Sequence, residues 1–231
     1  MQAVDDKTIV KNYFNSKGFD RWRRIYGNGD DVSKVQLDIR NGHQQTIDLV
    51  LAWLREDGNL PELSIFDAGC GVGSLSIPLA KAGATVYASD ISEKMVGEAK
   101  ERAQTALTDA SKLVLETKDL EAVTGQYHTV ICLDVLIHYP PKELEQMLEH
   151  LASLAESRII LSFAPFTACL MLWKKIGELF SGSSKTTRAY LHHKFDIVDF
   201  LEQKGFEVKR KDKIGTRFYF AYLIEAVRKN S

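Results

Sequence analysis

The chain has 231 residues, which is enough for one large α/β domain with a sizeable core and too few for two such domains. Its formal net charge of −1 predicts no general affinity for nucleic acid, which requires clustered positive charge. Three widely spaced cysteines, Cys70, Cys132 and Cys169, favour a reducing compartment and no metal site.

We expect neither a targeting segment nor a membrane span. Residues 1–7 include two aspartates and lack the apolar stretch of a signal peptide. The longest apolar stretch, residues 159–173, is interrupted by polar residues and is shorter than the ~20 residues of a membrane span. The expected location is the cytoplasm, and either the chain is bacterial or its presequence is absent.

The first 45 residues are expected to form a helical arm. An amphipathic pattern predicts a helix from Asp6 through Phe14, with Gly18 in the C-terminal capping position. A cluster of aromatic and basic residues follows at 19–27. A polar turn then leads into a second helix, from about Ser33 to Leu54.

The most informative stretch is Asp67-Ala68-Gly69-Cys70-Gly71-Val72-Gly73, between an expected strand at 63–66 and an expected helix at 74–81. Alternating glycines let the backbone bend sharply and approach a ligand, and the following helix presents free N–H groups. A second strand, 84–89, ends at Asp90, whose carboxylate could bind both hydroxyls of a ribose. Tight packing could also explain the glycines, and for Cys70 we favour packing over a nucleophilic role.

Two cofactor classes use such a turn. A dinucleotide-binding fold usually has G-x-G-x-x-G there, because the loop binds a pyrophosphate. The acid-x-G-x-G-x-G pattern resembles motif I of the class I S-adenosylmethionine-dependent methyltransferases, whose turn accepts the cationic methionine end of the cofactor. Asp67 would attract that cation and repel a phosphate. The resemblance implies S-adenosylmethionine as cofactor and S-adenosylhomocysteine as product.

Strands and helices continue to alternate along the chain. Ser92 is expected to cap a helix at 93–105, and Pro141 to begin one that ends near Leu154. Further strands are expected at 113–117, 129–133 and 158–163, and a further helix at 194–203. The last strands, 206–214 and 217–227, are separated only by a tight turn at Gly215-Thr216, which requires an antiparallel hairpin.

These elements predict an α/β, Rossmann-like class I methyltransferase fold. Such a sheet has seven strands in the order 3-2-1-4-5-7-6 with strand 7 antiparallel, whereas a dinucleotide fold usually keeps its sixth strand parallel. We expect one domain, 1–231, made of an arm or lid (1–45), a cofactor-binding core (46–163), a substrate-side insertion (164–193) and a C-terminal helix and hairpin (194–231). The insertion mixes apolar and basic residues, so it is either a helix packed on the sheet or a lid over a large, flat, anionic substrate.

Ligands of open α/β sheets bind beyond the carboxyl ends of the strands, here between strands 1 and 4. The predicted cofactor residues lie just past these ends: Asp67, Gly69, Cys70, Gly71 and Gly73 on the methionine side, Asp90, Ile91 and Met95 at the ribose and adenine, Asp119 and Leu120 at the adenine amino group, and Asp134 facing the methyl donor. Each acid could instead cap a helix or turn.

His138 is the best placed of the six histidines, since it follows Asp134 closely beside the expected methyl-transfer point. Its imidazole could orient an acceptor oxygen, or take a proton if the acceptor were a hydroxyl. A structural role in the loop is the alternative. We interpret His43, His128 and His150 as helix or surface residues.

The whole chain resembles the magnesium protoporphyrin IX methyltransferases of chlorophyll biosynthesis. The specific marks lie in the arm: Phe19-Asp20-Arg21-Trp22-Arg23-Arg24-Ile25-Tyr26-Gly27, Val35-Gln36-Leu37-Asp38-Ile39-Arg40 and Gly42-His43-Gln44-Gln45-Thr46. The resemblance extends through residues 133–139 and Phe163-Ala164-Pro165. It departs from plastid members in lacking a transit peptide, which favours a cyanobacterial or other bacterial source.

The resemblance implies methylation of the C13 propionate of magnesium protoporphyrin IX, with His138 orienting the carboxylate and Tyr26 of the arm closing the site. The magnesium belongs to the substrate, so no protein metal site is expected. It also implies a candidate partner, the porphyrin-binding subunit of magnesium chelatase, and weak peripheral association with photosynthetic membranes. Three alternatives stay open: a methyltransferase of another acceptor such as a phenol, a dehydrogenase, and a non-catalytic module that binds S-adenosylmethionine or a tetrapyrrole.

Overall fold

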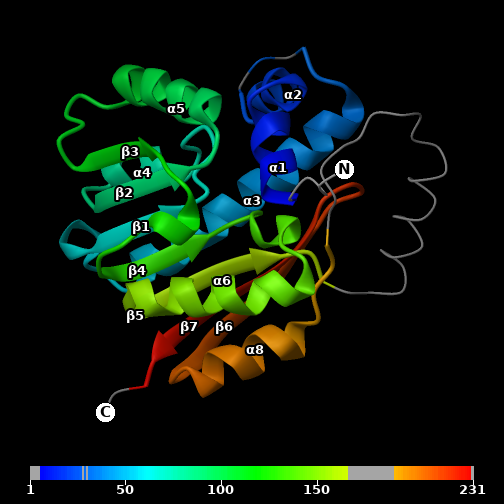
Figure 1. The fold of residues 1–231 in the computed structure, drawn as a ribbon. Coiled ribbons are helices and arrows are strands. Elements are labelled where there is room, and N and C mark those ends of the chain that lie inside the picture. Colours follow the sequence, from blue (N-terminus) through cyan, green and yellow to red (C-terminus); the bar gives the residue numbers. More distant parts are fainter. Residues whose placement is uncertain (1–5, 28, 30, 166–189, 230–231) are drawn as a thin grey trace.

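The computed structural model describes residues 6–165 and 190–229, apart from residues 28 and 30 (Figure 1). Its centre is a seven-stranded sheet in the order β3-β2-β1-β4-β5-β7-β6. The strands are β1 (Ser64–Ala68), β2 (Thr85–Asp90), β3 (Leu113–Thr117), β4 (Tyr127–Cys132), β5 (Ala155–Phe163), β6 (Phe206–Gly215) and β7 (Phe220–Arg228). β7 runs antiparallel to both β5 and β6, and the first five strands are parallel. The predicted strand order and the reversed seventh strand are confirmed.

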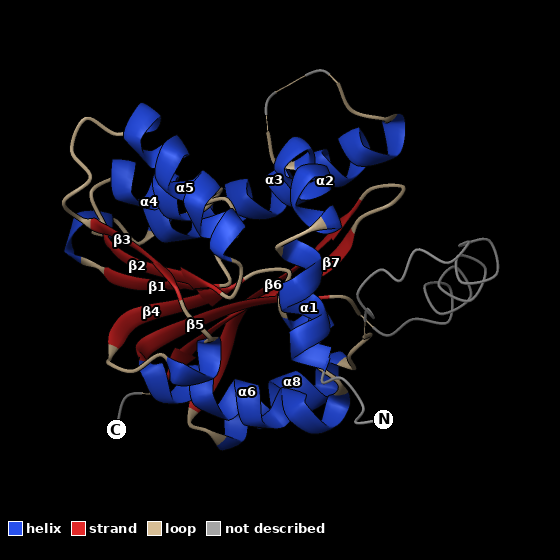
Figure 2. Cartoon of the chain, turned by 45° about the horizontal axis from the view of Figure 1, so that its top comes forward, coloured by secondary structure: helices blue, strands red, loops and turns tan. Residues whose placement is uncertain are grey.

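Helices cover both faces of the sheet (Figure 2). One face carries α3 (Lys34–Glu56), α4 (Ser76–Lys81) and α5 (Glu93–Ala106), and the other carries α6 (Pro141–Leu154) and α8 (Lys194–Gln203). Three short 3-10 helices, η1 (Leu60–Glu62), η2 (Leu120–Ala122) and η3 (Leu136–His138), lie in the connections. Within the described residues, no helix has both the length and the apolar character needed to cross a bilayer.

The hydrophobic core lies in two layers, one on each face of the sheet. Along a strand, successive side chains point to opposite faces. Ile131 of β4 therefore packs with α3 and α4, while its neighbours Val130 and Cys132 pack with α6 and α8. All three side chains are fully buried. This double burial explains why the central strands are almost continuously apolar in sequence.

The hairpin turn is longer than predicted. We expected the last strand to begin at Arg217, but β7 begins at Phe220. The carboxylate of Asp38 in α3 accepts hydrogen bonds from the Thr216 hydroxyl (2.6 Å) and the Phe218 amide (2.7 Å). These bonds hold residues 216–219 as a loop against the start of α3, so the turn cannot close at Gly215-Thr216.

The arm consists of α1 (Asp6–Phe14) and α2 (Lys17–Ile25). The prediction that Gly18 caps the first helix is wrong, because Gly18 lies inside α2. A side chain there would collide with the ring of Tyr13, which would lie 2.5 Å from its Cβ. Glycine is therefore needed for packing between the two helices and not for a left-handed cap.

The arm is docked onto α5 and α3. Arg102 of α5 donates a hydrogen bond to the backbone carbonyl of Tyr26 (2.7 Å), and Ser92 donates to the carbonyl of Phe14 (3.2 Å). Arg40 of α3 donates to the carbonyl of Ile25 (2.8 Å). Of the predicted insertion at 164–193, residues 166–189 lie outside the described residues.

Candidate active site

A pocket opens where β1, β2 and β4 end, beneath the arm. Of the predicted site residues, Gly69, Cys70, Asp90, Ile91, Met95, Asp119, Leu120, Asp134, His138 and Tyr26 line this pocket. Asp67, Gly71 and Gly73 lie in the same β1–α4 turn but do not line it. The sheet thus brings together residues that are widely separated along the chain.

The glycine turn requires glycine for different reasons at different positions. Gly69, Gly71 and Gly73 all have positive φ, at 77°, 54° and 79°. A Cβ on Gly69 would also lie 2.2 Å from a methyl carbon of Val135, whereas a Cβ on Gly71 would meet nothing within 4 Å. Packing therefore explains Gly69 but not Gly71, where the turn conformation and the open space favour the approach of a ligand.

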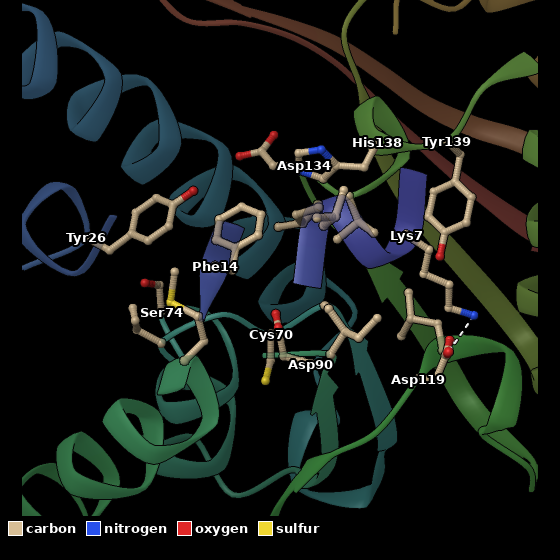
Figure 3. A pocket seen from close by; sticks show the side chains of 18 of the residues that line it. Lys7, Phe14, Tyr26, Cys70, Ser74, Asp90, Asp119, Asp134, His138 and Tyr139 are labelled. Atoms are coloured by element: carbon tan, nitrogen blue, oxygen red, sulfur yellow. Dashed lines mark ion pairs between the residues drawn. The ribbon is translucent and has the colours of Figure 1, made fainter. Parts of the chain in front are cut away.

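Asp90 ends β2 and is held by the turn. Its carboxylate accepts hydrogen bonds from the amides of Gly71 (3.0 Å) and Ser92 (2.8 Å), on one oxygen each. Burial nevertheless raises the pKa of Asp90. Each oxygen keeps further acceptor capacity, and the side chain lines the pocket (Figure 3), so it can accept hydrogen bonds from a ligand diol.

Asp67 lies beneath the turn and not at the pocket surface. It is almost fully buried, and the hydroxyl of Ser76 at the start of α4 donates a hydrogen bond to its carboxylate. Burial raises the pKa of Asp67 to about 6, and the nearby charge of Asp90 adds to this effect. Any action of Asp67 on a ligand is therefore through its charge.

The opposite end of the pocket is closed by the arm. Lys7 of α1 forms an ion pair with Asp119 (Figure 3) and another with Glu121, at 2.9 Å. Asp119 also caps η2, because its carboxylate accepts from the Glu121 amide. Leu120, Ile91 and Met95 line the space between, which suits an apolar, flat ring system.

His138 reaches the pocket from η3. Its ring forms a T-shaped pair with that of Phe14 from α1, with centroids 5.7 Å apart and planes at 80°. Burial lowers the pKa of His138 to about 4, so the imidazole is neutral at pH 7. Its buried Nδ1 has no hydrogen-bond partner among the described residues. Since the native fold leaves few buried polar atoms unpaired, this nitrogen is available to a ligand.

Tyr26 enters the pocket from the end of α2. Its ring lies on Trp22 (centroids 5.3 Å apart) and on His43 (4.3 Å). Figure 3 shows its hydroxyl directed inward, toward the side where Asp134 and His138 lie. Burial raises the pKa of Tyr26 well above its usual value, so the phenol keeps its proton.

His43 lies in a helix, α3, as interpreted from the sequence, but its place in the pocket was not predicted. His43 lines the pocket, and its Nδ1 lies 2.9 Å from a carboxylate oxygen of Asp134. The hydroxyl of Tyr219, just before β7, also donates to Asp134 (2.9 Å). His43 was part of the arm signature, which could have indicated it. Tyr219 has no distinguishing pattern in the local sequence, because only the folding of the sheet brings it close to Asp134.

Among the described residues we find neither a candidate metal site nor a reactive cysteine. No group of three or more histidine, cysteine, aspartate or glutamate side chains that could hold a metal is found among residues 6–165 and 190–229, the masked positions excepted. Cys70 and Cys132 are free and buried. Burial raises the pKa of both thiols, which agrees with a packing role for Cys70.

The sheet with its reversed β7, the glycine turn and the acid that ends β2 define a class I S-adenosylmethionine-dependent methyltransferase. A general methyltransferase domain model matches residues 65–157, and the model for the C-terminus of magnesium-protoporphyrin IX methyltransferase matches residues 132–228. The chain is 62% identical to magnesium-protoporphyrin O-methyltransferase of Synechocystis sp. PCC 6803, over 98% of both chains. The chain therefore belongs to the magnesium protoporphyrin IX methyltransferase family.

Other relatives agree with this assignment. The chloroplastic magnesium protoporphyrin IX methyltransferase of Arabidopsis thaliana is 53% identical, over 96% of this chain and 71% of its own length. The crystal structure of the Synechocystis enzyme with bound S-adenosylhomocysteine has a TM-score of 0.89 and 60% identity, covering 97% of this chain and all of that one. The same enzyme has also been crystallised with S-adenosylmethionine.

Proposed function

We propose that this chain transfers the methyl group of S-adenosylmethionine to the C13 propionate carboxylate of magnesium protoporphyrin IX, giving the monomethyl ester. The observation that carries the proposal is the 62% identity, over 98% of both chains, to a relative named for this reaction. The pocket supports it, because a cofactor side at Asp90 adjoins a second side formed by His138 and the arm.

The residues present fit S-adenosylmethionine. The open space at Gly71 and the acceptor oxygens of Asp90 suit the methionine end and the ribose, and Ile91, Met95 and Leu120 suit the adenine. When bound, the cofactor supplies an electrophilic methyl group on a sulfonium. Asp67, with its charge beneath the turn, would favour the cationic end, and Asp119 would receive the adenine amino group.

The reaction needs positioning more than acid–base catalysis. A propionate has a pKa near ~4 and is ionised at pH 7, so its oxygen is already nucleophilic. One O–C bond forms as one C–S bond breaks, and no proton is transferred. His138, with its pKa of about 4, is a weak base but can donate one hydrogen bond that orients the carboxylate. Proximity and alignment can lower such a barrier by about 7–11 kcal/mol.

The arm acts as the lid of this site. Phe14 of α1 and Tyr26, which follows α2, both line the pocket, so the arm must open to admit a macrocycle and close to exclude water. Tyr26 provides the second contact that closes the site over cofactor and porphyrin.

We also propose weak peripheral association with photosynthetic membranes and contact with the porphyrin-binding subunit of magnesium chelatase. Exposed apolar side chains at the start of α3, Val35 and Leu37, and at the hairpin turn, Phe218 and Phe220, support an apolar contact surface. Sedimentation with anionic vesicles, and with the purified subunit, tests the two proposals separately. Phe218→Ser should weaken both the vesicle association and the association with the subunit.

Two measurements test the proposed reaction. Calorimetric titration with S-adenosylhomocysteine should show one site per chain. A turnover assay with magnesium protoporphyrin IX should yield the monomethyl ester and no diester. A protein that binds S-adenosylhomocysteine but esterifies no porphyrin would contradict the proposal, and methyl transfer to a phenol in its place would favour the other acceptor class.

A further inference from the structure

A second imidazole lines the pocket beside His138. His43 lies in α3, with its Nδ1 2.9 Å from a carboxylate oxygen of Asp134 and its ring against that of Tyr26. Its other nitrogen, Nε2, forms no hydrogen bond with any residue that the structure describes. One nitrogen is therefore fixed by the protein, and the other is the polar atom that His43 can offer to a ligand.

The carboxylate of Asp134 is itself rigidly held. Its backbone has a positive φ of 59°, and its amide donates to the hydroxyl of Ser162 (2.8 Å). That hydroxyl donates back to the carboxylate (3.1 Å), and Tyr219 donates to both oxygens (2.9 and 3.0 Å). Although burial works to raise the pKa of Asp134, these bonds and the one from His43 hold it below its usual range.

Because Asp134 is ionised, it can only accept hydrogen bonds. The Nδ1 of His43 must therefore carry a proton and donate it. Two carboxylates act on His43, Asp134 through a direct hydrogen bond and Asp67 through its charge, and the ring of Tyr26 packs against it.

We propose that His43 is a second substrate-contacting residue, fixed by Asp134 and Tyr219 so that Nε2–H donates a hydrogen bond to the carboxylate of the acceptor. This inference rests on the proposed function, since it requires an anionic acceptor. With both nitrogens donating, the ring is an imidazolium that lies between two carboxylates, one of the protein and one of the substrate. Such charge-assisted hydrogen bonds are about twice as strong as neutral ones.

The charge balance of the pocket supports this role. Asp90, Asp119, Asp134 and Glu143 all line the pocket, which disfavours an anionic substrate. The ammonium of Lys7 is already paired with Asp119 and Glu121. His138 is neutral at pH 7. His43, with a carboxylate partner in place, is the lining group best suited to carry positive charge toward the acceptor.

The decisive variant is His43→Asn. The asparagine amide can replace Nδ1–H as a donor to Asp134, but it has no group at the position of Nε2. We expect kcat/KM for magnesium protoporphyrin IX to fall at least tenfold, while the dissociation constant for S-adenosylhomocysteine stays within twofold of wild type. His128→Asn, which removes an imidazole from the far end of β4, is the matched control and should retain wild-type kcat/KM.

Two outcomes separate the proposed function from the inference about His43. If the wild type forms no ester, the proposed function fails. If the wild type forms ester and His43→Asn does so with equal kcat/KM, only the inference about His43 is overturned.

Discussion

Asp67 is buried and Asp90 is half-buried at the proposed cofactor side of the pocket, and they are held in different ways. Asp90 accepts two backbone amides and lines the pocket, whereas Asp67 is bonded to Ser76 beneath the turn. A direct contact with a ribose is therefore possible only for Asp90. The two acids should differ in how they affect cofactor affinity.

Asp90→Ala should weaken binding of S-adenosylhomocysteine at least tenfold. The substitution removes two hydrogen bonds to the ribose, and bonds to a charged group contribute about 1.5–3 kcal/mol each. Isothermal titration calorimetry measures the dissociation constant directly. Asp109→Ala removes an exposed acid and the same unit of charge, so it serves as control. An unchanged constant for Asp90→Ala would rule out the assignment.

His138→Ala should lower kcat about tenfold while the affinity for S-adenosylhomocysteine stays nearly intact. The contact orients the acceptor and does not touch the cofactor, and one hydrogen bond to a charged group, about 1.5 kcal/mol, corresponds to roughly that factor. Steady-state kinetics with the metalloporphyrin provides the measurement, and Tyr26→Phe tests the phenol hydroxyl separately. Wild-type turnover by His138→Ala would mean that the imidazole only braces the loop.

The place of a single residue in the pocket could be predicted where that residue lies at or just after the end of a strand. Asp90, Asp134 and His138 follow the carboxyl ends of strands, and the sheet brings all three to one pocket. His43 and Tyr219 could not be placed in this way, because their approach to Asp134 depends on how α3 and the hairpin turn pack. Asp38 shapes this turn by binding Thr216 and Phe218, and nothing in the sequence around Asp38 indicates these distant partners.

Among the elements, the arm is the one whose position decides access to the site. It is docked through its backbone carbonyls to Arg102, Arg40 and Ser92, and through Lys7 to the loop after β3. Beside the ring contacts of Phe14 and Tyr26, these are polar contacts that water can replace, and we propose that the arm opens without unfolding the core.

Hydrogen exchange across residues 5–40 should slow when cofactor binds, since the arm closes over it. Lys7→Ala should speed exchange in α1 of the bound form by up to about fivefold, because a partly exposed ion pair contributes at most about 1 kcal/mol. Lys11→Ala, on the same helix, is the control. Equal exchange with and without cofactor would identify the arm as fixed structure.

Element boundaries were predictable where capping or breaking residues determine them. The predicted bounds of β3, α6 and α8 agree with the structure. Ser33 caps α3 with Gln36 in a reciprocal pair, and Ser92 caps α5. Gly18 was misassigned because a glycine that accommodates a neighbouring ring has the same sequence signature as one that ends a helix.

At the scale of the whole molecule, the strand order followed from the alternation of strands and helices and from the short final connection. Neither the alternation of elements nor the length of that connection depends on a side-chain contact. The contacts that complete the acceptor side of the pocket join residues far apart in sequence, such as His43 and Asp134 or Thr46 and Tyr219. Composition and periodicity carry no information on such pairs.

The buried His138 should make global stability depend on pH. Its pKa is about 4 in the folded protein and near 6.5 when unfolded, so between these values the unfolded chain binds more protons. The free energy of unfolding should therefore decrease as pH falls from 6.5 to 4, by up to about 3 kcal/mol. Urea titrations of the wild type and His138→Gln at several pH values test this. Parallel pH curves for the two proteins would contradict it.

The hydrogen bond between Thr46 and Tyr219 spans 173 residues of sequence. Ribosomes add about 5–20 residues per second, so roughly 10 to 30 s separate the synthesis of the two partners. For most of this interval the nascent chain contains the glycine turn and Asp90 but lacks the phenol that fixes Asp134. The cofactor side of the enzyme can therefore take shape during translation, whereas the wall that receives the acceptor is completed only when the hairpin has left the ribosome.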